Sequence, residues 1–207
     1  MEEIKRLLKR DRYLLTVITL FFLISVLAGA LLPKFYPDEA QQIIKFFAQH
    51  LRKIAEKIKH APVGVQIFTI WFNNLSASIT AIVSGVLIFP PLLSLLINGV
   101  GIGAFQYYTQ VHAKMGELQY YLSLAPHGIF EIPAFLLAVA MGVKFGLCLW
   151  RWFWHYFMQG ENLPILREFF RELKYYGALM LVLLTVAAVI EITLTPQIMI
   201  FWQRLIR

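Results

Sequence analysis

This 207-residue sequence contains few thiols and few charged side chains. Cys148 is the only cysteine, which excludes an internal disulfide and a thiolate metal cluster. Asp, Glu, Lys and Arg make up 15% of the residues, whereas a soluble domain usually has about 25%. Apolar residues make up 59% of the chain. The composition excludes an ordinary soluble protein and indicates a polytopic membrane protein.

Residues 61–111 contain no Asp, Glu, Lys or Arg. About 20 residues cross the hydrocarbon layer, so this stretch holds two crossings, with Pro90-Pro91 as the expected turn. The chain is therefore expected to be an all-α membrane helix bundle forming a single integral membrane domain. Five transmembrane helices are predicted, at about 14–32, 63–89, 92–108, 129–150 and 175–199. Residues 110–125 are expected to form a loop and residues 161–174 a short connector.

Residues 39–60 have the pattern of an amphipathic helix. Apolar side chains recur at three- and four-residue steps, at Ala40, Ile43, Ile44, Phe47, Leu51, Ile54 and Ile58. Basic side chains fall mostly on the opposite face. Two placements fit this pattern: in the headgroup layer of the membrane, or packed over the spans of the protein itself.

The formal net charge is +7, and the basic residues cluster beside the apolar spans. This arrangement favours contact with anionic membrane lipids, and no nucleic-acid partner is predicted. Lys and Arg are equally numerous in the loops on the two sides of the membrane. The dense cluster before the first span decides the orientation, with Lys5, Arg6, Lys9, Arg10 and Arg12. We expect a multi-pass protein of the cell membrane with a cytoplasmic amino terminus and an external carboxy terminus.

Polar residues inside the expected spans are the candidates for a functional site. His127 and Glu131, in the motif Pro126-His127-Gly128-Ile129-Phe130-Glu131-Ile132-Pro133-Ala134, share one face of a helix that Pro133 is expected to break. Each ionisable or amide group in lipid needs a partner or water. The candidate buried polar cluster contains Asn73, Asn74, Asn98, His127, Glu131 and Glu191. We expect His127, Glu131, Glu191 and at least one of Asn73 and Asn74 to meet in the outer half of the bilayer, in a structural or a functional role.

Small residues four positions apart form ridges on several of the expected spans. Such ridges allow close helix packing in membranes. The candidate packing residues are Ala77, Ala81, Gly85, Gly99, Gly103, Ala134, Ala138 and Gly142. The ridges of the second and fourth spans superpose with a shift of 57 residues, which suggests an internal repeat.

Catalytic signatures are missing from the sequence. No nucleotide-binding loop and no His-Glu-x-x-His pattern occur, and spacing marks no Ser or Cys nucleophile. One His with two Glu could hold a divalent metal, but no ligand spacing indicates it. We predict no catalytic residue, no metal and no cofactor, and an enzyme is the less favoured class.

The polar motifs resemble those of the stage II sporulation protein M family. The matching elements are Asn73-Asn74, Asn98-Gly99 with further glycines, Pro126-His127-Gly128 leading to Glu131, and Ala187 to Glu191 with Pro196. The resemblance covers about residues 63–196. It implies an integral membrane protein of about five spans, from a family found in bacteria and archaea. The sporulation member is associated with a septal complex that degrades peptidoglycan, and there it looks like an anchor or scaffold.

Two functions follow from these observations. The first is a membrane scaffold or anchor that organises other membrane proteins, or copies of itself as a homo-oligomer. The second is a small transporter, lipid-handling protein or intramembrane enzyme with a polar cavity around His127 and Glu131. A wet cavity favours the second function, and a tightly packed bundle favours the first.

Overall fold

The computed structural model describes residues 2–112, 116–159, 164–198 and 201, and its regular elements are all helical. In chain order these are α1 (Glu2–Arg10), α2 (Arg12–Phe35), α3 (Pro37–Ile58), α4 (Val63–Ser84), the 3-10 turn η1 (Gly85–Leu87), α5 (Phe89–His112), α6 (Glu117–Trp154), the π-helical turn η2 (His155–Gln159) and α7 (Ile165–Thr193). Helices α2, α4 with η1, α5, α6 with η2, and α7 are long and apolar enough to cross a membrane. The predicted all-α fold with five membrane helices is confirmed.

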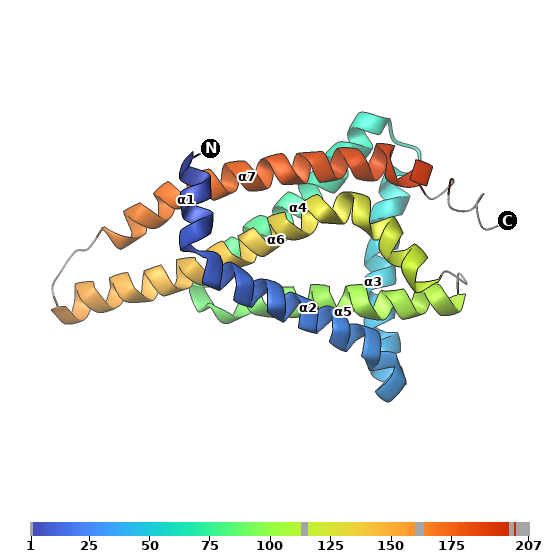
Figure 1. Cartoon of the computed structure of the whole chain (residues 1–207), viewed down its shortest axis with the longest axis horizontal. Coiled ribbons are helices and arrows are strands. Elements are labelled where there is room, and N and C mark those ends of the chain that lie inside the picture. Colours follow the sequence, from blue (N-terminus) through green and yellow to red (C-terminus); the bar gives the residue numbers. More distant parts are fainter. Residues whose placement is uncertain (1, 113–115, 160–163, 199–200, 202–207) are drawn as a thin grey trace.

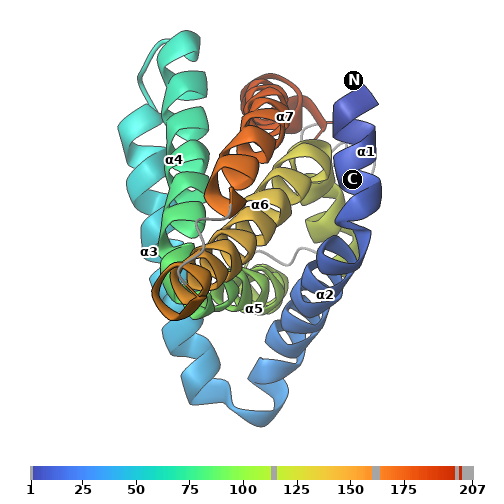
Figure 2. The same ribbon diagram turned by 90° about the vertical axis from the view of Figure 1, so that its left-hand side faces the viewer.

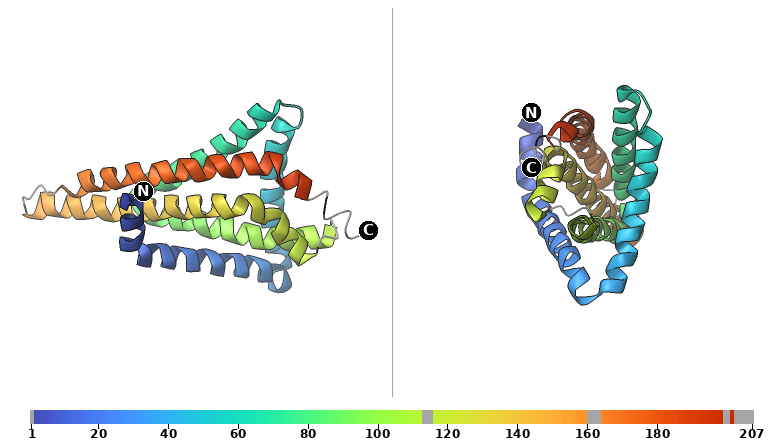
Figure 3. Two further views of the ribbon diagram at one scale, coloured as in Figure 1. Left: turned by 45° about the horizontal axis from the view of Figure 1, so that its top comes forward. Right: turned by 90° about the vertical axis from the view of Figure 1, so that its right-hand side faces the viewer.

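Two amphipathic helices mark the expected edges of the membrane. α1 and α3 cross the long axis of the molecule, along which α2, α5, α6 and α7 run (Figure 1; Figure 3, left). They flank α2, whose 24 residues give a length of about 36 Å. This length matches the hydrocarbon layer with part of the headgroup region. We therefore take the planes of α1 and α3 as the two edges of the bilayer.

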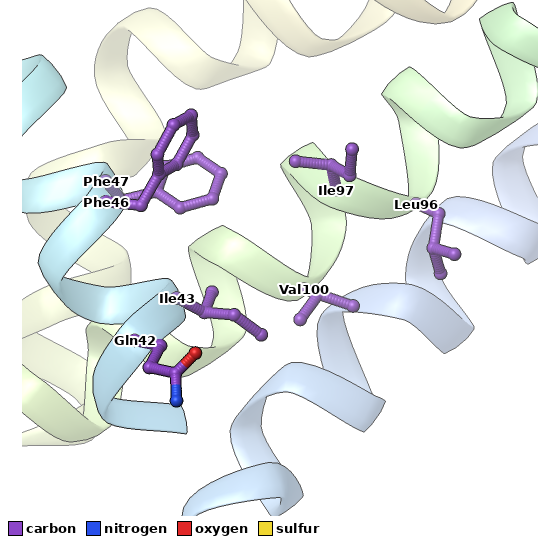
Figure 4. Close-up of a pocket in the computed structure, with 7 residues that line it drawn as sticks. All are labelled: Gln42, Ile43, Phe46, Phe47, Leu96, Ile97 and Val100. Carbon is purple, nitrogen blue, oxygen red and sulfur yellow. The ribbon is translucent and has the colours of Figure 1, made fainter. Parts of the chain in front are cut away.

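α3 packs its first half on the membrane helices. Ala40 and Ile44 are buried, and the ring of Phe47 occupies the space where a Cβ on Gly101 would lie. Beyond Leu51 the helix has few buried positions. Between α3 and α5 lies a groove lined by Gln42, Ile43, Phe46, Phe47, Leu96, Ile97 and Val100 (Figure 4). The apolar stripe thus serves partly to hold α3 against α5.

α6 is the central helix of the bundle, with α2, α4, α5 and α7 around it (Figure 2). Residues 136–141 are buried in an unbroken run, as expected for a helix covered on all sides. α4 runs in the same direction as α6, and α4 with η1 contacts α6 through glycine. A Cβ on Gly85 would lie 2.0 Å from the carbonyl oxygen of Gly142. The two backbones are therefore in direct contact.

A second parallel pair, α2 and α5, is packed in the same way. A Cβ on Gly103 would lie 2.0 Å from the carbonyl oxygen of Val26, and one on Gly29 would lie 2.2 Å from that of Val100. Small residues let two helix backbones approach in this manner, which compensates for the missing hydrophobic drive in lipid.

The turn between the second and third spans differs from the prediction. Pro90 and Pro91 lie in the first turn of α5, and the chain reverses before them, at Ile88 with φ of 63°. Proline suits the first turn of a helix because its missing N–H would have no helical partner there. The left-handed backbone at Ile88 supplies the reversal that we assigned to the prolines.

α6 begins earlier than predicted and continues through Pro126 and Pro133. The loop expected at residues 110–125 is therefore wrong for 110–112, which belong to α5, and for 117–125, and the break expected at Pro133 is wrong as well. Figure 1 shows a bend in the first part of α6, which is the usual consequence of proline inside a helix. Packing holds this part in place, because the Tyr120 hydroxyl donates to the Ile102 carbonyl at 2.9 Å.

The connector expected at residues 161–174 is already helical from Ile165 onward. Phe169 is buried and stacks on Phe145 of α6, with ring centroids 5.2 Å apart. This contact gives the start of α7 a buried face that its charged residues concealed in the sequence. α7 ends at Thr193, before Pro196, and not near residue 199.

The arrangement predicts which loops share a side of the membrane. Single cysteines replacing Glu2, Lys59 and Met158 in a Cys148→Ala background should react with a membrane-impermeant maleimide. Glu2 and Met158 should label from the cytoplasmic face, and Lys59, which follows α3, only from outside. Labelling of all three from one face would contradict five crossings. The carboxy-terminal residues 202–207 lie outside the described residues, so the side on which they emerge stays a prediction.

Candidate functional site

Three ionisable side chains meet near the α3 end of the bundle. A ring nitrogen of His127 and carboxylate oxygens of Glu131 and Glu191 lie within 4.8 Å of one another. His127 and Glu131 share a face of α6, as their spacing predicts, and Glu191 comes from the last turn of α7. All three are partly buried. We call this set the His-Glu-Glu cluster.

Thr195 is the hydrogen-bonding neighbour of the histidine. The Thr195 hydroxyl donates to the Ile190 carbonyl at 3.3 Å, and its oxygen lies 3.4 Å from His127 Nδ1. In the tautomer with a proton on Nδ1, the ring donates to Thr195 and its lone pair is on Nε2. Neither carboxylate has a hydrogen bond or ion pair within the described part of the chain.

The three amides of the predicted cluster are satisfied elsewhere. Asn73 donates to the Asn74 side chain at 3.3 Å, and Asn98 donates to the Ser94 carbonyl of its own helix at 2.8 Å. Among residues 2–112, 116–159 and 164–198, no hydrogen bond joins these amides to the His-Glu-Glu cluster. The structure thus brings together the ionisable members and leaves the amides in local pairs.

The candidate packing residues are mostly where close packing needs them. Ala81, Ala134 and Ala138 are buried. Gly85 and Gly142 lie at one backbone contact and Gly103 at another, whereas Gly99 packs closest to the side chain of Ser25. Ala77 differs, because it is exposed and its neighbour Ser78 is buried. Gly85 faces Gly142, the residue that the shift of 57 pairs with it, so equivalent points of the two ridges touch.

A second polar cluster at the opposite end was not among the sequence candidates. Arg10 forms two hydrogen bonds to Glu172, at 2.7 and 2.6 Å. Lys144 Nζ lies 2.8 Å from Asp11 and 2.5 Å from Glu172, and the Tyr176 hydroxyl donates to Asp11 at 2.9 Å. We call Arg10, Asp11, Lys144, Glu172 and Tyr176 the charge network.

The charge network is neutral, and its charged side chains other than the half-exposed Arg10 are largely shielded from solvent. The Asp11, Lys144 and Glu172 side chains are 10%, 19% and 8% exposed. Burial alone would raise the pKa of Asp11, but the hydrogen bonds from Arg10, Lys144 and Tyr176 outweigh burial and lower it. The bonds to Glu172 and Asp11 raise the pKa of Arg10. Both groups are therefore ionised at neutral pH, and the network joins α1 to α6 and α7.

A sequence signal for the charge network existed but was ambiguous. Lys144 stands alone in an apolar span, and a lone lysine near a helix end is equally consistent with snorkelling to the membrane surface. Its partners come from residue 11 and residue 172, so only the tertiary fold brings them together.

Comparison with known proteins places the chain among membrane proteins. The family model described as stage II sporulation protein M matches residues 18–196. The chain is also similar to an uncharacterised protein of Methanocaldococcus jannaschii, with 26% identity over 202 residues, which are 95% of this chain and 89% of that protein. No solved structure matches.

Proposed function

Since this chain belongs to the stage II sporulation protein M family, we propose that it is a membrane scaffold that holds a partner membrane protein through the tip formed by α6, η2 and α7. The observation that supports this function is a projecting, aromatic hairpin. We define the aromatic hairpin as residues 150–159 with residues 164–170. It extends beyond α1 and the turn between α4 and α5 (Figure 1; Figure 3, left).

The aromatic hairpin carries large apolar side chains that its own fold does not cover. Those exposed are Trp150, Phe153, Trp154, Tyr156, Phe157, Met158 and Phe170. Aromatic rings of the hairpin contact each other: the rings of Phe153 and Phe157 are 4.5 Å apart, and Tyr156 stacks on the half-buried Trp152 with ring centroids 5.5 Å apart. A large preformed aromatic surface costs little side-chain entropy on binding, and Trp and Tyr are enriched at interface hot spots.

The position of the tip favours a protein over lipid as its partner. Lys144 in the charge network and the exposed Arg12 at the start of α2 mark the edge of the hydrocarbon layer. The Trp150 indole donates to the Val86 carbonyl at 3.3 Å, which places Trp150 level with the turn between α4 and α5. Trp154 lies ten residues beyond Lys144, about 15 Å along the helix. The headgroup layer is only about 5–7 Å thick on each side. With the edge of the hydrocarbon layer taken at Lys144, the tip extends past the headgroup layer, on the side we expect to be cytoplasmic.

The charges around the tip indicate the chemistry of the partner. Arg151, Arg167, Arg171 and Lys174 are exposed, and the only exposed acid among residues 150–159 and 164–174 is Glu168. A pocket between these charges is lined by Pro164, Arg167, Glu168 and Arg171. We expect a partner surface with an apolar centre and an acidic rim, because complementary charges speed association and exclude other proteins.

Photo-crosslinking from the tip tests the proposed function. A photoreactive amino acid at Phe157 should give discrete adducts with one or a few membrane proteins in the native host. The double variant Trp154→Ala/Phe157→Ala should weaken co-purification of the adduct protein by about 30-fold or more, the effect of losing a hot spot of about 2 kcal/mol.

Val182 provides the matched control, because it is equally exposed but lies in the middle of α7, where we expect lipid to cover it. The same photoreactive group there should react with lipid alone. Lipid adducts from Phe157 would contradict the scaffold, and adducts of two copies of this chain would indicate a homo-oligomer interface. Solute uptake by reconstituted vesicles that depends on Glu131 would support the second function, a small transporter, which the His-Glu-Glu cluster favours.

A further inference from the structure

We propose that the His-Glu-Glu cluster binds one divalent transition-metal ion, of the class that includes Zn²⁺, Mn²⁺ and Fe²⁺. This site is independent of the scaffold surface, which lies at the other end of the bundle. The ligands would be a ring nitrogen of His127 and one carboxylate oxygen each from Glu131 and Glu191.

The first observation in favour of a metal ion is the closeness of two unpaired carboxylates. Glu131 and Glu191 lie on different helices with oxygens within 4.8 Å, between membrane-spanning segments. Two carboxylates so close in an apolar setting repel each other, and no Lys or Arg pairs with either of them in the described parts of the chain. A bound dication removes this repulsion and satisfies both groups.

The second observation in favour of a metal ion is the position of His127 beside Thr195. His127 Nδ1 lies 3.4 Å from the Thr195 hydroxyl oxygen, and in the tautomer with Nδ1–H this contact orients the ring and leaves the lone pair on Nε2. Metal-binding histidines usually donate their other ring N–H to such an outer partner. The pattern is thus that of a ligand prepared for a metal, with Thr195 as the positioning residue.

The dimensions fit a small ion. Donors about 2.1 Å from a tetrahedral ion lie about 3.4 Å from one another, so small side-chain rotations within the 4.8 Å cluster close the site. A mixed nitrogen and oxygen donor set favours transition metals over Mg²⁺ and Ca²⁺, which prefer oxygen alone. Three protein ligands leave a coordination position open.

The ion would clamp the end of α7 to α6. Glu191 lies two residues before the end of α7, and α6 bends in its first part. A shared metal ion would hold these two segments together. Metal binding should therefore stabilise the fold as any ligand of the native state does.

Metal titration of the purified full-length protein tests the site. After treatment with a chelator, Co²⁺ should bind in one equivalent and produce the visible absorption of a low-symmetry Co²⁺ centre. Zn²⁺ should compete for it and raise the melting temperature. Glu131→Gln and Glu191→Gln should each weaken Co²⁺ binding by more than about 100-fold, and Thr195→Val by about 10- to 100-fold through the histidine.

The control is His50→Gln/His60→Gln, which removes two histidines of the segment around α3 and should leave the titration unchanged. Loss of binding in this control, with unchanged binding in the Glu131 and Glu191 variants, would overturn the site. So would the absence of any saturable signal. A rise in melting temperature of metal-free Glu131→Gln, with no response of the wild-type protein to Co²⁺ or Zn²⁺, would show a shared proton in place of a metal and also overturn it.

Discussion

Replacing Gly142 by alanine should destabilise the protein by about 2 kcal/mol, although alanine is the better helix former. In an exposed helix the same change stabilises by about 1 kcal/mol. At Gly142 the added Cβ would lie 2.3 Å from the carbonyl oxygen of Ala81, a backbone atom that cannot rotate away. α4 and α6 must then separate, and forced overpacking typically costs about 1–3 kcal/mol or occasionally more.

Thermal unfolding in detergent measures this effect. Gly85→Ala should behave like Gly142→Ala, because its Cβ would lie 2.0 Å from the Gly142 carbonyl. Gly177→Ala is the matched control, since no atom lies within 4 Å of its added Cβ, and it should leave the melting temperature unchanged or raise it. Equal effects of all three substitutions would mean that α4 and α6 do not touch through their backbones.

The same glycines show how far the sequence could predict the fold. Spacing alone identified the ridges and the five spans, because membrane helices need long apolar stretches and small residues where they touch. The sequence could not show that Ala77 faces outward and Ser78 inward, since this depends on the rotation of α4 about its axis. The turn at Ile88 was missed because an isoleucine with positive φ has no sequence signature, whereas Pro90-Pro91 strongly suggests a turn.

The contacts of a polar residue were predictable in two cases: where its partner lies close in sequence, and where a charged residue is the only one in an apolar span. His127 and Glu131 share a helix face by spacing, and Glu191 is the only charge in its span, so their meeting could be expected. The amides could not be placed, because an asparagine in a membrane helix can satisfy itself on its own helix, as Asn98 does with Ser94. The charge network was missed because Arg10, Asp11 and Glu172 lie in the polar segment before the first span and in the expected connector, far in sequence from Lys144 and Tyr176 in the predicted spans.

Breaking the charge network from one side should have the second large effect. Lys144→Met leaves Asp11 and Glu172, both nearly buried, with Arg10 as the remaining cation in the network. Removing one partner of a buried ion pair typically costs about 3–5 kcal/mol, because the other charge stays buried without compensation. Glu172→Leu should cost a similar amount, since Lys144 and Arg10 would then share the single carboxylate of Asp11.

The double variant Lys144→Met/Glu172→Leu tells a charge effect from a packing effect. It removes one charge of each sign and leaves Arg10 paired with Asp11 at 3.0 Å, so the network stays neutral. We expect the double variant to be more stable than either single variant, with a coupling energy of about 2 kcal/mol or more in thermal unfolding. Arg52→Met/Glu56→Leu is the control, since this ion pair on α3 is 81% and 64% exposed and should show little coupling. Additive losses at Lys144 and Glu172 would mean that these side chains act independently, and that the network does not hold α1 against the membrane helices.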